Sequence, residues 1–168
     1  MGVEDHHLEA AEQPPIPVAL IITTDSRTEA TDESGKLARE LLEAAGCRVV
    51  SHEFAANDPH ATRAAVEKAL GRGARVVILS GGTGIGRRDL TVETVSAMSE
   101  KRLEGFGELF RMLSFKDIGA AAMLSRAFLG VKDGKILVCL PGSPKAVRLA
   151  LEKLLIPELK HLLKQTER

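Results

Sequence analysis

The sequence predicts a doubly wound α/β domain, in which helices cover both faces of a mostly parallel sheet. Apolar runs at residues 18–23 and 75–80 are continuous rather than alternating, which is typical of parallel strands buried on both faces. Segments with helical periodicity separate such runs, and the connections are short. The chain has 168 residues, 44% of them hydrophobic, so it can bury the core of one domain.

The first half of the chain is expected to alternate strands and helices. Leucines and alanines between Leu37 and Ala45 recur at helical spacing, and Gly46 follows them as a stop signal. Pro59 favours the first turn of a second helix, which the Gly71-Arg72-Gly73 segment ends. In order, we expect strand 18–23, polar loop 24–33, helix 34–45, strand 48–54, helix 59–70 and strand 75–80.

The second half is expected to add one antiparallel strand. Asp133-Gly134 separates two apolar runs, and an Asp-Gly pair in that position is a strong hairpin signal. Pro157 is expected to break the C-terminal helical region. In order, we expect helix 91–98, polar segment 100–104, helix 105–115, strands 126–131 and 135–140, and helices 143–155 and 157–164.

The charge balance argues against nucleic acid and membranes as partners. The 23 basic and 23 acidic residues cancel, so no basic field exists to attract a nucleic acid or an anionic membrane. No apolar run is long enough to span a bilayer. A neutral surface also does little to oppose self-association, which is compatible with a homo-oligomer.

The remaining composition indicates a single cytoplasmic domain. Cys47 and Cys139 lie far apart without metal-ligand spacing, which fits a reduced interior. Residues 1–15 contain no apolar core of a secretory signal and are predicted to form a disordered tail before one domain at 16–168. The His6-His7 pair in that tail lacks the further ligands that a metal site needs.

A glycine-rich loop after the third predicted strand is the main candidate site. Ser80-Gly81-Gly82-Thr83-Gly84 follows an apolar run, and two arginines and Asp89 precede the helix expected from Thr91. Glycines bring backbone N–H groups close to an anion, and the following helix start adds a partial positive charge. Arg88 can pair with further oxygens, and Asp89 can hold Mg²⁺ against a phosphate.

This loop matches neither of the familiar nucleotide motifs. Gly81 and Gly86 have the Walker spacing, but Arg87 and Arg88 occupy the positions of its Lys and Ser or Thr. Arg87 also stands where the dinucleotide fingerprint requires its third glycine. The residues alone therefore leave two readings open, a different phosphate loop or only a tight turn.

A second strand-to-helix turn, Pro141-Gly142-Ser143-Pro144-Lys145, follows the last predicted strand. Taken alone it favours a capped helix start, with Ser143 as N-cap and Pro144 at the first helical position. In open α/β sheets, however, loops at the carboxyl ends of the strands converge on one crevice. Two such turns together make a ligand site there the better expectation.

The acidic candidates each have a structural alternative. Asp89 is equally consistent with a helix-dipole partner or with an ion pair to Arg88. Asp58 precedes Pro59 and fits an N-cap better than a catalytic group. Spacing likewise favours a structural Glu108–Arg111 pair on helix 105–115, and His52, His60 and His161 are expected at the surface.

Four ordered motifs together resemble the molybdenum-cofactor biosynthesis proteins of the MoaB and MogA type, whose domain also occurs in gephyrin. They are Ser80–Thr91, Glu104–Arg111, Leu124–Arg126 and Leu140–Lys145, and the resemblance covers roughly residues 16–160. Glu104–Arg111 is most similar to the MoaB branch. The resemblance implies a three-layer α/β/α domain that assembles as a trimer or hexamer.

The resemblance also implies a reaction. Members of this family adenylylate molybdopterin, whose terminal phosphate attacks the α-phosphorus of Mg-ATP to give adenylyl-molybdopterin and pyrophosphate. ATP would be the co-substrate, Mg²⁺ the cofactor, and other enzymes of the same pathway possible partners. A non-catalytic protein that binds pterin or nucleotide in the same pathway is the alternative, and the sequence leaves molybdenum and tungsten equally open.

Carried over to this sequence, the motifs imply site residues. Asp89 would be the catalytic acid and metal ligand, and Asp58 falls on a second important aspartate of the family. Asp58 lacks the preceding Pro and following acid that are common there, and Ser143 stands where several relatives carry Asn. The implied substrate- or nucleotide-binding residues are Ser80, Gly81, Gly82, Thr83, Gly84, Arg88, Glu108, Ser125, Arg126, Pro141, Gly142, Ser143 and Lys145.

Overall fold

The structure, a computed structural model, describes residues 13–168. The disorder predicted for most of the tail, and the His6-His7 pair, lie outside these residues. The strands are β1 Pro17–Thr23, β2 Arg48–Ala55, β3 Val76–Ser80, β4 Lys101–Arg102, β5 Phe128–Lys132 and β6 Lys135–Leu140. The helices are α2 Glu33–Ala44, α3 Pro59–Gly71, α4 Thr91–Met98, α5 Glu104–Ile118, α6 Pro144–Ala150 and α7 Ile156–Thr166, with a 3₁₀ segment η1 Gly119–Leu124 and a π segment η2 Leu151–Leu155.

The strands form one sheet in the order β2-β1-β3-β6-β5-β4. The first four of these are mutually parallel, and β5 runs antiparallel to both of its neighbours. Asp133 and Gly134, both at positive φ, form the two-residue hairpin that reverses the chain between β5 and β6. The predicted sheet with a single antiparallel strand is confirmed.

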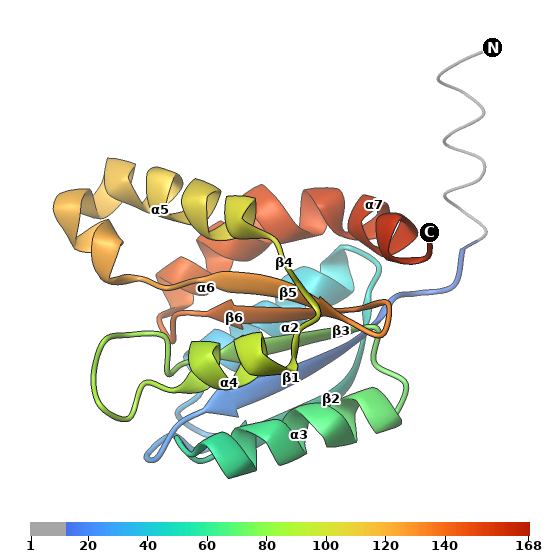
Figure 1. Ribbon diagram of the computed structural model, residues 1–168, viewed down its shortest axis with the longest axis horizontal. Helices are drawn as coiled ribbons and strands as arrows, with labels where there is room; N and C mark the ends of the chain where they lie inside the picture. The colour runs from blue at the N-terminus through green and yellow to red at the C-terminus, as the bar shows by residue number, and fades with distance from the viewer. Residues whose placement is uncertain (1–12) are drawn as a thin grey trace.

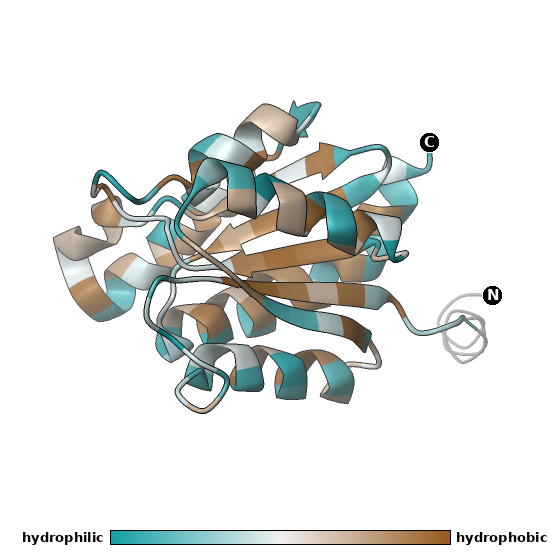
Figure 2. Cartoon of the chain, turned by 90° about the horizontal axis from the view of Figure 1, so that it is seen from below, coloured by the Kyte–Doolittle hydropathy of each residue, from teal (hydrophilic) through white to brown (hydrophobic). Residues whose placement is uncertain are grey.

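Helices cover both faces of the sheet, which completes the predicted three layers (Figure 1). Alternate residues of the central strands point to opposite sides: Leu20 and Ile78 belong to one core, Ile21 and Leu79 to the other. The first core contains residues of α2, α5, α6, η2 and α7, and the second contains residues of α3 and α4. Figure 2 shows the hydrophobic residues gathered on the central strands.

This topology positions the candidate site. The connection from β1 through α2 covers one face of the sheet, and the connection from β2 through α3 covers the other, so the order reverses between β1 and β3. In such sheets the crevice for ligands opens at the carboxyl ends of the strands, next to the point of reversal. Thr23, Ser80 and Leu140 end β1, β3 and β6 at that edge.

Most element boundaries agree with the predictions to within one or two residues, and three features differ. Lys101 and Arg102 form the short edge strand β4, which the polar segment 100–104 did not predict because neither side chain is apolar or buried. Helix 105–115 extends through residue 118 and continues as η1. The helical region around Pro157 does not break. The π segment η2 precedes Pro157, and the N–H of Ile156 donates to Leu151 five residues back.

Both cysteines are free thiols. Burial raises the pKa of Cys139, which lies fully inside the sheet, and burial also raises the pKa of Cys47. Both thiols are therefore protonated and weakly reactive near neutral pH. Among residues 13–168, no helix has the length and apolar character needed to cross a membrane.

Candidate functional site

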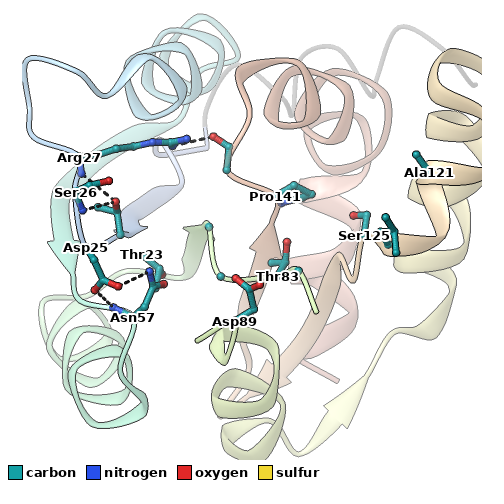
Figure 3. Close-up of a pocket in the computed structure, with 16 residues that line it drawn as sticks. Thr23, Asp25, Ser26, Arg27, Asn57, Thr83, Asp89, Ala121, Ser125 and Pro141 are labelled. Atoms are coloured by element: carbon teal, nitrogen blue, oxygen red, sulfur yellow. Dashed lines mark hydrogen bonds between the residues drawn. The ribbon is translucent and has the colours of Figure 1, made fainter. Parts of the chain in front are cut away.

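A cleft of about 640 Å³ opens at the carboxyl edge of the sheet, between the ends of β1, β3 and β6 and the segment η1 (Figure 3). Four separate loops contribute to its wall. The lining residues are Thr23, Thr24, Asp25, Ser26, Arg27, Asn57, Gly81, Gly82, Thr83, Gly84, Asp89, Ala121, Leu124, Ser125, Pro141 and Gly142. The expectation that the two glycine turns meet in one crevice is confirmed.

The glycine loop requires glycine for two physical reasons. Gly81 and Gly82 adopt φ values of +107° and +67°, which other residues rarely adopt. A Cβ on Gly81 would also lie 2.3 Å from the carbonyl oxygen of Thr23, and one on Gly82 would lie 2.1 Å from Oγ1 of Thr91. The loop backbone therefore packs directly against β1 and α4 at the wall of the cleft.

Asp89 folds back against the same loop. Its Oδ2 accepts a hydrogen bond of 2.8 Å from the N–H of Gly86, and a Cβ on Gly84 would lie 2.7 Å from that oxygen. Gly84 and Gly86 are therefore needed to leave room for the carboxylate. Arg88 pairs with Asp25 at 2.9 Å, so the Arg88–Asp89 ion pair considered from the sequence is replaced by one across the cleft edge. Asp89 itself lines the cleft.

Arg126 braces the glycine loop from behind. Its guanidinium donates to the carbonyl oxygens of Thr83, Gly84 and Asp89 and pairs with Glu93 on α4. Burial opposes ionisation of Glu93, but the hydrogen bonds from Arg126 and from the backbone outweigh it and lower the pKa of that carboxyl. Arg126 therefore binds the carbonyl oxygens of the loop from outside the cleft. It holds the loop in place and does not line the cleft itself.

The turn after β6 is held by ordinary capping. Ser143 accepts a hydrogen bond of 3.2 Å from the N–H of Ala146 and begins α6. The carbonyl oxygen of Gly142 accepts from Nη1 of Arg27 at 2.8 Å and from Oγ of Ser34 at 2.6 Å. Ser80 Oγ donates to the carbonyl of Pro141, which joins the two turns.

The sequence reasoning missed the part of the cleft that follows β1 and β2. Asp25, Arg27 and Asn57 line the cleft, yet residues 24–33 were assigned only as a polar loop. Hydrogen bonds from the N–H and side chain of Asn57, helped by the nearby charge of Arg88, lower the pKa of Asp25. The signal was available, because this polar loop also follows the carboxyl end of a central parallel strand.

Several polar atoms in and beside the cleft have no partner within residues 13–168. The buried atoms Thr23 Oγ1, Asn57 Oδ1 and Ser125 Oγ are among them, and all three residues line the cleft. Buried polar atoms are normally satisfied, so orphaned ones in a cleft wall indicate a polar ligand. The ligand expected here is an oxygen-rich or charged one.

These donors fit a Mg²⁺ ion. The carboxylate of Asp89, the amide oxygen of Asn57 and the hydroxyl of Thr23 are hard oxygen ligands on residues that line the cleft. Within residues 13–168 no three His, Cys, Asp or Glu side chains gather as a metal site. Mg²⁺ does not need such a cage, because it is usually held by one or two carboxylates together with waters and substrate phosphates.

Some residues implied by the resemblance lie outside this cleft. Asp58 is exposed and caps α3, accepting from the N–H of Ala61 at 2.8 Å, while its neighbour Asn57 lines the cleft. Ser143 and Lys145 line a separate small cavity of about 80 Å³. Glu108 is exposed on α5, away from the residues that line the cleft.

Helix α4 begins at Thr91 as predicted, with Leu90 in the cap position and Thr91 buried beneath Gly82. Two local predictions about side chains are wrong. Arg111 donates to the carbonyl of Ser125 at 3.4 Å instead of pairing with Glu108. His52 is not a surface histidine, since its Nε2 lies 2.8 Å from Oδ2 of the buried Asp32.

Comparison with known proteins agrees with this architecture. Residues 19–161 match the family described as "Probable molybdopterin binding domain". The chain is 44% identical to Molybdenum cofactor biosynthesis protein B of Bacillus cereus over 164 residues, which cover 96% of both chains. It is 45% identical to the protein of the same name from Halalkalibacterium halodurans, over 98% of this chain and 97% of that one.

Solved structures show the same fold. A crystal structure of Molybdenum cofactor biosynthesis protein B is 44% identical, has a TM-score of 0.88, and covers 92% of this chain and 97% of its own. The tungsten cofactor synthesizing protein MoaB from Pyrococcus furiosus is 33% identical with a TM-score of 0.84, over 92% and 98% of the two chains. The resemblance stated from the four motifs is confirmed, and the chain belongs to the molybdopterin-binding family that includes the MoaB proteins.

Proposed function

We propose that this protein acts in molybdenum cofactor biosynthesis and adenylylates molybdopterin, with ATP as co-substrate and Mg²⁺ as metal ion. The observation that carries the proposal is the cleft in which the glycine loop and Asp89 face the loops after β1 and β6. An oxygen of the terminal phosphate of molybdopterin attacks the α-phosphorus of ATP. The bond from the α-phosphorus to the oxygen that links it to the β-phosphorus breaks, and pyrophosphate leaves with that oxygen.

The loop residues supply the positioning that such a reaction needs. Phosphoryl and nucleotidyl transfers depend mainly on alignment and on neutralisation of developing charge. The backbone of Gly81 to Gly84 lines the cleft. The N–H of Gly81 donates to the carbonyl oxygen of Leu140, so the N–H groups of Gly82 to Gly84 are the ones suited to hold phosphate oxygens. Arg126 keeps this backbone in one conformation through the loop carbonyl oxygens.

Charged side chains around the cleft support the same reaction. When bound, Mg²⁺ would neutralise phosphate charge, and Asp89, Asn57 and Thr23 are the residues that would hold it. Arg27 lines the cleft beside Gly142 and can balance the charge of the pyrophosphate leaving group. The cleft has a volume of about 640 Å³, which is in the range of small-molecule sites.

The test is a direct product assay with purified protein, molybdopterin and Mg-ATP. We expect adenylyl-molybdopterin and pyrophosphate in equal amounts, and loss of both when EDTA removes the metal. The matched control is the Lys153→Gln variant, because Lys153 is exposed on η2 and lies outside the cleft. Absence of both products from the wild type under these conditions contradicts the proposal.

One observation favours a second candidate function, a pterin-binding or scaffold protein without turnover. Asp58, which the resemblance implies as a second catalytic aspartate, caps α3 and does not line the cleft. This candidate predicts that molybdopterin binds with the same affinity to the wild type and to Asp89→Asn, and that neither protein forms product. Product formation by the wild type removes this candidate.

We also propose that the protein is a cytoplasmic homo-oligomer, a trimer or hexamer, formed through the exposed face of α5 and η1. Large apolar side chains are exposed along this face, namely Leu109, Met112, Phe115, Ile118, Met123 and Leu124. Such a continuous patch is typical of an interaction surface. Glu104 and Glu108 lie in the first half of α5 and Lys116 in its last turn, so a second copy of the helix can offer complementary charges.

Light scattering coupled to size-exclusion chromatography measures the oligomeric state. We expect Met112→Glu with Phe115→Glu to reduce the mass to that of a monomer, about 18.0 kDa. Phe54→Glu, on the edge strand β2, is the control and is expected to leave the mass unchanged. A monomeric wild type at micromolar concentration contradicts this proposal without touching the proposed reaction.

A further inference from the structure

Another cavity, of about 170 Å³, lies behind the glycine loop. It is bounded by α4, the start of α5 and the residues that lead into β5. Figure 1 shows β4 joining α4 to α5 in this part of the molecule. None of its lining residues lines the cleft, although Arg126 on its wall is the residue that braces the glycine loop.

The wall of this cavity is rich in arginine. Arg102, Arg111 and Arg126 all line it, and Glu104 is its single acidic residue. Arg126 is neutralised by Glu93, whereas the ion pairs within residues 13–168 leave Arg102 and Arg111 without a carboxylate partner. The cavity therefore has an excess of positive charge although the chain as a whole is neutral.

Arg111 is held in place by its own helix. Its guanidinium lies over Gly107, where a Cβ would approach Nη1 to 3.0 Å, and Nη1 makes only one long hydrogen bond of 3.4 Å to the carbonyl of Ser125. Most of its N–H groups are thus available to a ligand. A guanidinium with free donors matches the oxygens of a tetrahedral anion.

The start of α5 faces the same cavity. This helix has 15 residues, and Leu103 in the cap position provides no side-chain hydrogen bond to the first turn. Glu104 and Gly107 of the first turn line the cavity. Uncapped N–H groups and the helix dipole favour an anion at such a position.

Ser96 provides an independent indication. The residue is 8% exposed and lines the cavity from α4, and its Oγ is buried without any partner within residues 13–168. Leaving a hydroxyl buried and unpaired is destabilising, so such a group marks the position of an absent polar ligand.

We propose that this cavity binds a tetrahedral oxyanion of the size of inorganic phosphate, held by Arg102, Arg111, the Ser96 hydroxyl and the start of α5. The volume suits such an ion with its waters and is too small for a nucleotide, whose pockets are typically about 300 to 1,000 Å³. The site is separate from the proposed adenylylation cleft and does not depend on that reaction. Through Arg126 the bound ion contacts the brace of the glycine loop.

The test is a titration of the ¹⁵N-labelled protein with inorganic phosphate, followed by backbone amide shifts. We expect saturable shifts at Ser96 and at Glu104 to Gly107, separate from any shifts at Gly81 to Gly84 in the cleft. The Arg102→Gln and Arg111→Gln double variant is expected to raise the phosphate Kd, as measured from the shifts at Ser96 and Glu104 to Gly107, at least about tenfold. The reason is that each charge-assisted hydrogen bond lost is strong. Arg63→Gln with Lys153→Gln removes the same charge from exposed sites elsewhere and is expected to leave that Kd unchanged.

The Ser96→Ala variant distinguishes a hydroxyl that binds phosphate from one that is only buried without a partner. We expect the Tm of the phosphate-free protein to rise, because an unpaired buried hydroxyl is removed, while the Kd for phosphate rises severalfold. A higher Tm with unchanged phosphate Kd contradicts the role of Ser96. The proposal is overturned if phosphate shifts only the amides of Gly81 to Gly84. It is also overturned if the double arginine variant leaves the phosphate Kd of the arginine-lined cavity unchanged.

Discussion

The two strand-to-helix turns that meet in the cleft are built in different ways. The turn after β6 is short, and Ser143 caps α6 as local sequence rules require. The loop after β3 contains two glycines at positive φ and is held by Asp89 from within and by Arg126 from a distant segment. The turn after β6 has a local cap in addition to its contacts from Arg27, Ser34 and Ser80. The glycine loop leads into α4 without a side-chain cap and depends on Asp89 and on the distant Arg126.

This difference shows which of the two turns indicates a bound ligand. A capped helix start needs few residues and tolerates change, so its presence says little about a ligand. The glycine loop adopts positive φ values that glycine tolerates and most other residues do not, which is a pattern found where a backbone approaches a ligand closely.

Gly81→Ala is expected to destabilise the protein by about 3 kcal/mol, whereas Gly142→Ala is expected to change stability by less than about 1 kcal/mol. A methyl group on Gly81 would meet the Thr23 carbonyl oxygen at 2.3 Å at a φ of +107°. On Gly142 it would meet Arg27 at 3.4 Å and the Cα of Gly81 at 3.6 Å, which are ordinary contact distances. Urea unfolding of both variants measures the contrast, and equal losses would show that the two turns do not differ.

Arg126→Ala is expected to cost about 2 kcal/mol of stability and to weaken ATP binding about tenfold, because the loop carbonyl oxygens lose their donors. Arg27→Ala removes the corresponding bond to Gly142 and is expected to cost about 1 kcal/mol. Denaturation and calorimetric titration with Mg-ATP compare the two variants. If Arg126→Ala binds ATP as the wild type does, the brace is not needed for the cleft.

Ser143→Ala is expected to lower stability by about 1 kcal/mol through loss of the α6 cap. Because Ser143 does not line the cleft, we expect its KM for ATP to stay within about twofold of the wild type, a difference below about 0.5 kcal/mol. Steady-state kinetics measures this. A large rise in KM without loss of stability would mean that Ser143 binds substrate, as the family resemblance implies.

The smallest expected effect is on pH dependence. Glu93 and Asp25 have lowered pKa values in the folded protein. Hydrogen bonds from Arg126 and the backbone to Glu93, and from Asn57 to Asp25 with a smaller effect of Arg88, therefore stabilise the folded protein at neutral pH. This stabilisation is lost as pH falls below about 4, through the folded pKa values. Glu93→Gln and Asp25→Asn should each give a shallower fall of Tm between about pH 5 and pH 3. Unchanged slopes in both variants contradict the assignment.

Much of the fold could be predicted from the sequence because local signals and buried runs agree. Continuous apolar strands, Gly46 after α2 and the Asp133-Gly134 hairpin each specify their own geometry. Lys101 and Arg102 could not be predicted as a strand, since pairing with β5 and not their composition makes them one. The π segment before Pro157 likewise reflects packing of the C-terminal helices.

The site was predictable where loops follow strands and not where contacts are long-range. The glycine loop and Pro141–Gly142 were found from their pattern, and both line the cleft. Asp25 follows β1 and Asn57 follows β2, but the two residues become neighbours only when β1 and β2 pair, which their positions in the sequence do not show. Arg126 was expected to bind substrate, but the structure directs its donors to the loop backbone, which sequence spacing cannot indicate.

We propose that Asp89 takes part in nucleotidyl transfer and does not only stabilise the conformation of its loop. The most direct measurement is the rate of adenylyl-molybdopterin formation by the wild type and by Asp89→Asn, each with its unfolding curve. Asn retains an oxygen that can accept from Gly86, so we expect stability within about 1 kcal/mol of the wild type. We expect the rate to fall by at least about a hundredfold, because the negative ligand for Mg²⁺ is lost. An Asp89→Asn variant that forms the product at the wild-type rate would contradict the account.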